Sequence, residues 1–345
     1  MLISNNGLTV TVRDKNSVKS ADNYVYFDWN VFRFIMQPPS DSYWDKENID
    51  GILFNIRKKY DIPLSHAHLR DRASRFTETS RETTKTDFLM LKTITESLFI
   101  GKGDNDSFLL VHQDGEKLFD NVLSAEKKVD VLSDKLPEFP AVFTVDMDSM
   151  NKKHPLYDIL VENGGHMSPE IMDKFLVECY DSIFSDASLY RMLRQFVNQI
   201  KIGKNVMKQS EQGADKEWLK NFKEHTHPFI ASLKYDVDNL KKQWKYIALK
   251  WFSWQNDMSK LSDKDMLCKS YCLLDCHPKF QDALRKNKNT LTNIAVDAEH
   301  AYWGTDSKYF VSRDKHMLAK IRFLYDAYGI KSKPIEMSDF LRQFC

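Results

Sequence analysis

Long hydrophobic runs, an excess of one charge and a high cysteine content are all missing from this sequence. No apolar stretch approaches the roughly 18–20 residues that span a bilayer, and the polar residues 1–19 lack the apolar core of a signal peptide. Five cysteines are an odd number in a chain of 345 residues, which argues against a secreted disulfide framework. We therefore expect a cytoplasmic protein with no membrane partner.

The charges nearly cancel, because 50 Lys and Arg residues accompany 49 Asp and Glu residues. This balance excludes a highly basic nucleic-acid coat protein and an acidic tail protein, and it leaves a local basic groove open. Hydrophobic residues make up 42% of the chain and aromatic residues 12%, which is enough for a substantial core. The length suits one elaborated domain or two ordinary ones.

Both ends of the chain alternate between strand and helix patterns. Apolar and polar spacing predicts strands over 24–27, 108–111, 309–311 and 333–336, and helices over 49–60, 65–75, 87–99, 290–303 and 315–328. Pro334 places the last strand near a sheet edge. This order favours a parallel α/β unit built from both ends of the chain.

The middle of the sequence is typical of helices. Apolar residues recur at helical spacing after Ser168, after Ser185 and from Leu233 to Trp251, while 140–146 suits a strand. We therefore predict an α/β domain with an N-terminal half over 20–115, a mostly helical insertion over 116–262 and a C-terminal half over 263–345.

Four carboxylates have positions that suggest a common site. Asp28 and Asp314 each follow a predicted strand, and the carboxyl ends of parallel strands meet at one edge of a sheet. Asp297 lies on the preceding helix, on the same face as His300, and Asp71 lies on the helix after 62–63. Clustered carboxylates repel unless Mg²⁺ or Mn²⁺ compensates, although Asp at a strand end is also common as a turn or cap residue.

The motifs around these acids resemble those of PIN-domain nucleases. The chain opens with Tyr26-Phe27-Asp28-Trp29-Asn30-Val31, and the segment 62–71, ending in Arg70-Asp71, resembles the part of the family with the second acid. Asp297-Ala298-Glu299-His300-Ala301 and the segment 306–314, ending in Ser312-Arg313-Asp314, resemble the closing pattern of the family. The resemblance covers about 24–99 and 291–335 and does not include the middle.

This resemblance implies a three-layer fold with a central parallel sheet and metal-dependent phosphodiester hydrolysis, most often of RNA. Asp28, Asp71, Asp297 and Asp314 would be the catalytic acids that hold Mg²⁺ or Mn²⁺. The implied supporting residues are Asn30 beside Asp28, Ser312 orienting the last carboxylate or a phosphate, and Asp306 as an extra ligand or a turn cap. The second acid is chosen among Asp71, His68 and Glu78. A toxin or anti-phage defence effector is the implied setting.

Several basic and aromatic side chains have two interpretations each. Arg70, Arg72 and Arg75 suit contacts with an RNA backbone, yet interleaved acids equally suit a solvated helix face. His68 and His300 suit supporting roles beside the acids. Trp244 and Trp251 fit a helical core stripe better than base stacking, and Cys268, Cys272 and Cys276 fit buried structural cysteines better than a zinc site.

Two other functions compete with the nuclease. A haloacid-dehalogenase-like phosphohydrolase also begins with a strand that ends in Asp, but its motif has a second Asp where this chain has Asn30. A catalytically silent PIN-like module would use the helical insertion to bind a protein partner or inhibitor, and the presence of all four acids argues against it.

Overall fold

The computed structural model describes most of both chain ends and part of the middle. The described residues are 2–5, 8–11, 18–38, 44–103, 107–125, 152, 157–162, 164, 190, 193–194, 197–198, 228–252, 262–281 and 291–345. They form a mixed α/β structure, mostly helical, with two small sheets. The strands are β1 (Leu2–Asn5), β2 (Leu8–Thr11), β3 (Val18–Ser20), β4 (Val25–Phe27), β5 (Leu98–Lys102), β6 (Phe108–His112), β7 (Tyr309–Ser312) and β8 (Lys333–Glu336).

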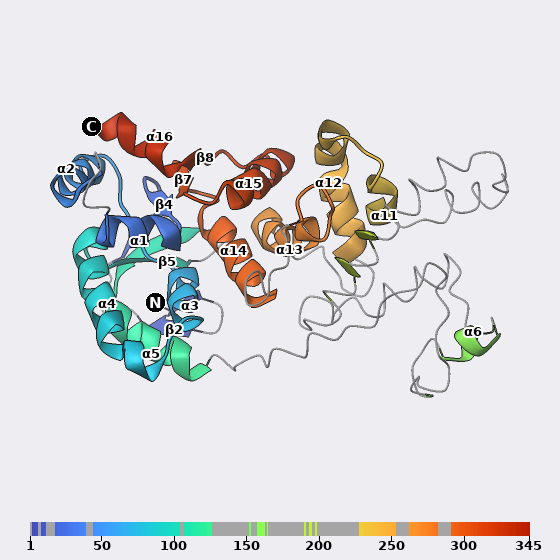
Figure 1. The fold of residues 1–345 in the computed structure, drawn as a ribbon, viewed down its shortest axis with the longest axis horizontal. Coiled ribbons are helices and arrows are strands. Elements are labelled where there is room, and N and C mark those ends of the chain that lie inside the picture. Colours follow the sequence, from blue (N-terminus) through green and yellow to red (C-terminus); the bar gives the residue numbers. More distant parts are fainter. Residues whose placement is uncertain are drawn as a thin grey trace. The chain divides into compact units, whose positions relative to one another are not determined.

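Helices occur both before and after the middle segment of the chain (Figure 1). Before the middle segment they are α1 (Trp29–Met36), α2 (Lys46–Arg57), α3 (His66–Ala73), α4 (Arg81–Thr95) and α5 (Gly115–Ala125). Later in the chain they are α6 (Tyr157–Glu162), α11 (Pro228–Ser232), α12 (Val237–Phe252), α13 (Asp263–Asp275), α14 (Leu291–Trp303), α15 (Lys315–Tyr328) and α16 (Met337–Leu341).

The chain divides into two compact units. The first, here called the α/β unit, consists of Met1–Val129, Ser262–Tyr271 and Thr292–Cys345, and the second of Asp130–Leu261 and Cys272–Leu291. Both ends of the chain therefore contribute to one unit. Its limits differ from the predicted boundaries near 115 and 262, because residues up to 129 belong to the α/β unit and 272–291 belong to the second unit.

A three-stranded parallel sheet joins the two ends of the chain. Its order is β4-β7-β8, and Val25, Tyr26 and Phe27 pair with Tyr309, Phe310 and Val311. The parallel arrangement predicted from the strand and helix order is confirmed. Pro334 lies in the edge strand β8, where its missing N–H costs no ladder hydrogen bond.

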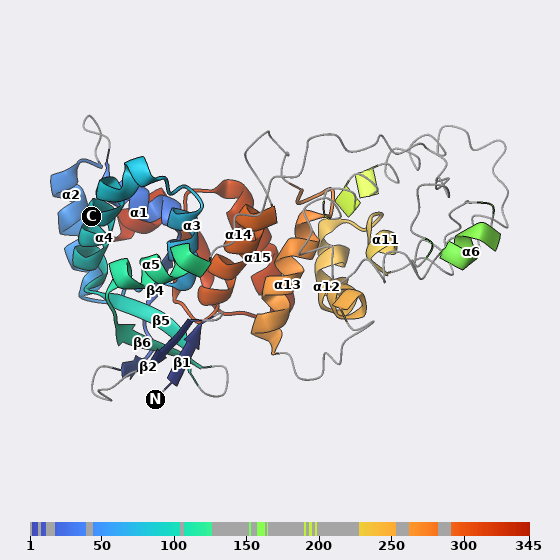
Figure 2. The ribbon, with the colours of Figure 1, turned by 90° about the horizontal axis from the view of Figure 1, so that it is seen from below.

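The five-stranded sheet has the order β2-β1-β5-β6-β3 and antiparallel pairs (Figure 2). The extended segment 61–64 lies between the two sheets, because Val25 N donates to Asp61 O at 2.9 Å and Ile100 N donates to Leu64 O at 2.7 Å. The predicted helix over 87–99 is wrong at its end. Glu96 and Ser97 take positive φ values of 54° and 62°, so α4 stops at Thr95 and the chain continues into β5.

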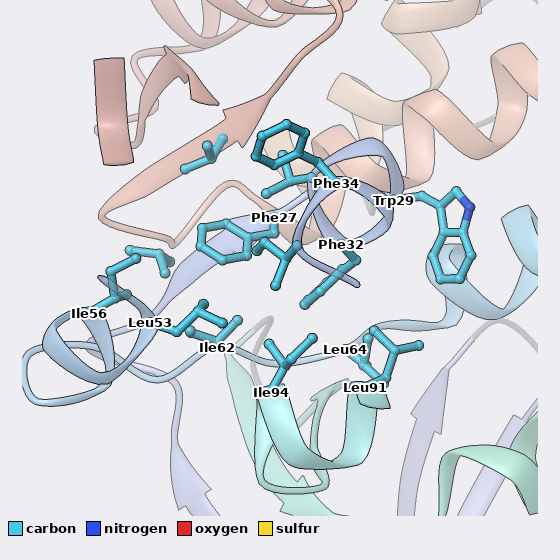
Figure 3. Packing of buried hydrophobic residues seen from close by; sticks show 14 of the residues in the cluster. Phe27, Trp29, Phe32, Phe34, Leu53, Ile56, Ile62, Leu64, Leu91 and Ile94 are labelled. Carbon is cyan, nitrogen blue, oxygen red and sulfur yellow. The ribbon is translucent and has the colours of Figure 1, made fainter. Parts of the chain in front are cut away.

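The core of the α/β unit lies between α1, α2, α4 and the strand β4 (Figure 3). Phe27 on β4 and Phe32 on α1 are both buried, with ring centroids 5.7 Å apart. Each such side chain contributes about 1.5–3 kcal/mol through burial. This core fixes α1 against β4 and hence the direction in which the chain leaves the strand at Asp28.

The described part of the second unit is helical. Trp244 and Trp251 are buried on α12, which confirms their core role, and buried Asp275 accepts a hydrogen bond from Arg194 at 2.6 Å. The predicted strand over 140–146, the helix after Ser168 and Trp254 lie outside the described residues. No helix in the described ranges is long and apolar enough to cross a membrane.

Candidate functional site

Asp28 and Asp314 begin helices at the same edge of the parallel sheet. Asp28 follows β4 and caps α1, where its Oδ1 accepts from Val31 N at 2.9 Å. Asp314 follows β7 and caps α15, where its Oδ1 accepts from His316 N at 2.8 Å and Met317 N at 3.0 Å. Both acids are therefore helix caps, and the parallel pairing of β4 and β7 also brings them to one edge.

Ser312 connects these two acids. Its buried hydroxyl donates a hydrogen bond to Asp28 Oδ2 and accepts one from Asp314 N at 2.9 Å. The hydroxyl therefore orients the first carboxylate and the backbone of the last. The role expected from the sequence is to orient the last carboxylate or a phosphate, and in the structure the hydroxyl bonds the first carboxylate instead of the last.

The Asp28 carboxyl is 2% exposed, and its surroundings change its acidity. The pKa of Asp28 is raised to about 6, mainly by burial and to a smaller extent by the nearby Asp71. The Ser312 hydroxyl, His300 and the Val31 amide act against this increase. A proton therefore leaves Asp28 close to neutral pH.

Asp71 joins the site through a chain of buried polar groups. Its Oδ2 lies 2.9 Å from His300 Nε2, whose N–H donates to the carboxylate. His300 Nδ1 lies 2.8 Å from the Tyr26 hydroxyl, which lies 2.7 Å from the Ser65 hydroxyl. In the neutral imidazole, Nδ1 accepts from Tyr26. The candidate second acid Glu78 is instead an exposed partner of Arg81.

His68 supports the end of β4 and not a metal. Ser65 N donates to its Nδ1 at 2.9 Å, so the proton sits on Nε2 and is donated to Phe27 O at 2.7 Å. Burial, followed by the charge of His300, lowers the pKa of His68 well below its usual value. Both ring nitrogens are thus occupied, and the residue before Asp28 is held in place.

Asp297 on α14 responds to all three other predicted acids. Burial raises the pKa of Asp297 well above its usual value, and Asp71, Asp314 and Asp28 raise it further. Lys320, a buried residue of α15, acts in the opposite direction. Asp28, Asp71 and Asp314 are therefore all near enough to Asp297 to raise its pKa, and Lys320 is near enough to lower it.

Asp306 does not join this group. It lies before the start of β7, whereas Asp314 follows the end of that strand, and four strand residues span about 13 Å. Its Oδ2 pairs with Lys264 Nζ at 2.6 Å. The expectation of an extra metal ligand at Asp306 is therefore corrected, because the strand separates it from the other acids.

Two of the three predicted phosphate-binding arginines already have carboxylate partners. Arg72 is buried and its Nε donates to Asp87 Oδ2 at 2.9 Å, and Arg70 donates to Glu299 Oε2 at 3.2 Å. Only Arg75 of the three is exposed. The pairs fix α3 against α4 and α14 and leave Arg70 and Arg72 poorly placed for substrate.

Whether these side chains could hold a metal ion depends on their chemistry and on their positions. Four carboxylates supply the oxygen ligands that Mg²⁺ and Mn²⁺ prefer. The pKa of Asp297 is raised first by desolvation and then by the neighbouring acids, and a bound cation would favour the ionised form. Within the described ranges, however, no three His, Cys, Asp or Glu side chains are placed to hold an ion as they stand. Asn30 is half-buried in the first turn of α1.

The sequence analysis missed several residues that shape the site. Tyr26 lies two residues before Asp28 on β4, a spacing that puts both side chains on one side of a strand and that would have identified it. Lys320 lies between Met317 and Leu324 on the apolar face of α15, so a lysine in an apolar stripe was the signal. Glu299, buried with His66 Nδ1 at 2.8 Å, had no comparable signal.

The three cysteines of the predicted stripe are free thiols. Cys272 and Cys276 are buried, and burial raises the pKa of Cys268 to about 12. The interpretation as buried structural cysteines is confirmed for Cys272 and Cys276, whereas Cys268 is only partly buried. Comparison with known proteins adds no relative, since no protein-family model, curated protein or solved structure matches this chain.

Proposed function

We propose that this chain is a metal-dependent nuclease that hydrolyses phosphodiester bonds, with single-stranded RNA as its substrate. The observation that supports this proposal best is the position of Asp28 and Asp314, which the parallel pairing of β4 and β7 brings to one edge of the sheet, together with Asp297, whose pKa is raised by desolvation first and then by Asp71, Asp314 and Asp28. Structural acids are normally paired with cations, as Asp87 is with Arg72. Four neighbouring carboxylates repel one another when they are ionised, and a divalent cation would stabilise that form.

Asp28, Asp71, Asp297 and Asp314 would hold the Mg²⁺ or Mn²⁺ ion in this proposal. When bound, the ion supplies positive charge for the phosphate and lowers the pKa of a water molecule. The chelating arrangement requires the side chains to move closer than they are in the structure. Asp314, which is exposed, has the most freedom to do so.

The protein's own residues prepare the acids for this role. Ser312 fixes the rotamer of Asp28, and His300 fixes that of Asp71. Tyr26 and Ser65 in turn orient the His300 ring. Asp28, with a pKa of about 6, is ionised at neutral pH and accepts a proton readily below it. A PIN-like arrangement of β4, β7 and β8 is part of the same proposal.

The test is cleavage of labelled single-stranded RNA and DNA by the full chain with Mn²⁺, with Mg²⁺ and with EDTA. The double variant Asp28→Asn/Asp314→Asn keeps the size of both side chains and removes their charges. Asp306→Asn is the matched control, because Asp306 lies at the other end of β7. We expect metal-dependent RNA cleavage by the wild type and the control, and none by the double variant.

Other results would replace this function. Equal cleavage by the wild type and the double variant would exclude these acids as the active site. Hydrolysis of small phosphate esters without nucleic-acid cleavage would favour a phosphohydrolase. Metal binding with no turnover on any substrate would favour a silent binding module.

A further inference from the structure

We infer that Arg313 and its basic neighbours form the phosphate-binding subsite of the carboxylate site, in place of Arg70 and Arg72. This inference rests on the proposed function, since it specifies how the same site grips a nucleic-acid backbone. It begins from a problem of charge. Four acids repel a polyanion, so a nucleic-acid substrate needs cations near them.

Arg313 has a fixed position relative to the acids. It lies between Ser312, which bonds Asp28, and Asp314, whose backbone N–H donates to the same Ser312 hydroxyl at 2.9 Å. The short loop between β7 and α15 therefore places Arg313 next to two of the four acids.

The guanidinium group of Arg313 is held by an aromatic ring. Its Cζ lies 4.7 Å from the centroid of the Phe34 ring, and Phe34 belongs to α1, the helix that Asp28 caps. Figure 3 shows the Phe34 ring on a different side of α1 from Trp29. A guanidinium stacked on a ring keeps its N–H groups in the plane, directed outward, where they can bind two oxygens of one phosphate.

The surroundings of Arg313 add positive charge. Lys315 begins α15 and Arg33 precedes Phe34 on α1, and both side chains are exposed, as is Arg313. Among the residues that the structure describes, these three cations are not paired with a carboxylate. Arg70 and Arg72, by contrast, donate to Glu299 and Asp87. Arg33 and Lys315 belong to the two helices that Asp28 and Asp314 cap, and Arg313 lies in the loop before α15.

The decisive experiment compares three arginine variants of the full chain. Arg313→Ala removes the proposed contact, Arg75→Ala removes the exposed arginine of the α3 region, and Arg342→Ala removes an exposed arginine near the C-terminus. Binding of fluorescein-labelled single-stranded RNA is measured by anisotropy in EDTA at several salt concentrations. Initial cleavage rates are measured in Mn²⁺ at subsaturating RNA.

We expect Arg313→Ala to weaken binding about tenfold, as loss of a charged hydrogen-bond donor does. The slope of log affinity against log salt should become shallower by about 0.7, the value for one phosphate of a single strand. Arg313→Lys, which keeps the charge but loses the planar group, should give an intermediate loss. Arg342→Ala should bind like the wild type.

Two results would overturn the inference. One is wild-type affinity and salt slope for Arg313→Ala, and the other is a larger loss for Arg75→Ala. RNA binding that depends on Arg313 without any cleavage would support the subsite and reject the nuclease. Metal-dependent cleavage that ignores Arg313 would reject the subsite alone, and absence of RNA binding by the wild type would reject both.

Discussion

The hydroxyl of Ser312 donates a hydrogen bond to the buried carboxylate of Asp28, although the two residues lie 284 positions apart in the sequence. The bond spans the pair of parallel strands β4 and β7 that join the two ends of the chain. Together with His300, it is one of the contacts through which the C-terminal half of the α/β unit lowers the pKa of the first acid. Because it lowers the pKa of Asp28, it keeps that group ionised to a lower pH than burial alone would allow.

Removal of this hydroxyl should change both acidity and stability. Ser312→Ala is expected to raise the pKa of Asp28 above about 6 and to lower the free energy of unfolding by about 1–3 kcal/mol. The acidic limb of the pH profile for RNA cleavage should move to higher pH. Ser332→Ala, which removes a buried hydroxyl bonded to Ser307, is the control. A loss of stability in both variants with no movement of the pH profile in Ser312→Ala would contradict this role.

The raised pKa of Asp28 predicts a pH-dependent cost of folding. The folded state holds the Asp28 proton to a pKa of about 6, whereas the usual value is 3.8, so this group favours folding at low pH and disfavours it as pH rises from 4 to 6. Asp28→Asn removes the effect. The variant should match the wild type near pH 4 and be more stable above pH 6, by up to about 3 kcal/mol.

Denaturant unfolding of the wild type and Asp28→Asn in EDTA, at several pH values between 4 and 8, measures this difference directly. Subtracting one protein from the other cancels the titration of groups that both share. A difference in unfolding free energy that stays constant over this range would show that Asp28 is not held with a raised pKa.

Two variants in the chain of polar groups from Asp71 to Ser65 should lower stability to different extents. Tyr26→Phe removes one hydroxyl and should lower the free energy of unfolding by about 1–2 kcal/mol. His300→Ala removes bonds to both Tyr26 and Asp71 and leaves a cavity, so about 2–4 kcal/mol is expected. Cleavage should fall in both variants because Asp71 loses its fixed orientation. Tyr328→Phe, which removes a hydroxyl bonded to Ser270, should cost similar stability and leave cleavage unchanged; equal effects of all three on cleavage would reject the positioning role.

Variants of Arg72 and Arg75 should distinguish an arginine that stabilises the fold from an exposed arginine. Arg72→Ala breaks a buried pair with Asp87 and should lower the free energy of unfolding by about 3–5 kcal/mol. Arg75→Ala changes an exposed side chain and should alter it by less than about 0.5 kcal/mol. Urea unfolding compares them, and the double variant Arg72→Ala/Asp87→Ala should recover part of the loss. Unchanged stability with weaker RNA binding in Arg72→Ala would support the prediction from the sequence that Arg72 contacts the RNA backbone.

The local elements near the site could be predicted because their signals lie within a few residues. Asp28, Ser65 and Gly329 each mark a helix end through their own chemistry, and the order of strands and helices was sufficient to predict the parallel sheet. The end of α4 was missed because the turn depends on Glu96 and Ser97, two residues with no strong preference for positive φ.

The ion-pair partners of charged side chains could not be predicted from the sequence. Arg72 and Arg75 lie three residues apart with similar neighbours, and only the packing of α4 gives Asp87 to one of them. The same applies to Arg313. Its proposed role depends on contact with the ring of Phe34, which comes from the other end of the chain. In the sequence, Asp306 belongs to the same motif as Asp314 and therefore resembled a ligand. The structure shows that β7 separates the two residues.

The most direct test of the central claim is Mn²⁺ binding to the full chain, followed by electron paramagnetic resonance of the free and bound ion. If the four carboxylates form one divalent-cation site, the wild type and Asp306→Asn bind Mn²⁺ alike, and Mg²⁺ competes. Asp297→Asn and Asp28→Asn/Asp314→Asn should bind far more weakly. Wild-type Mn²⁺ binding in both of these variants would contradict the account, because it would place the ion away from the acids on which the proposed function depends.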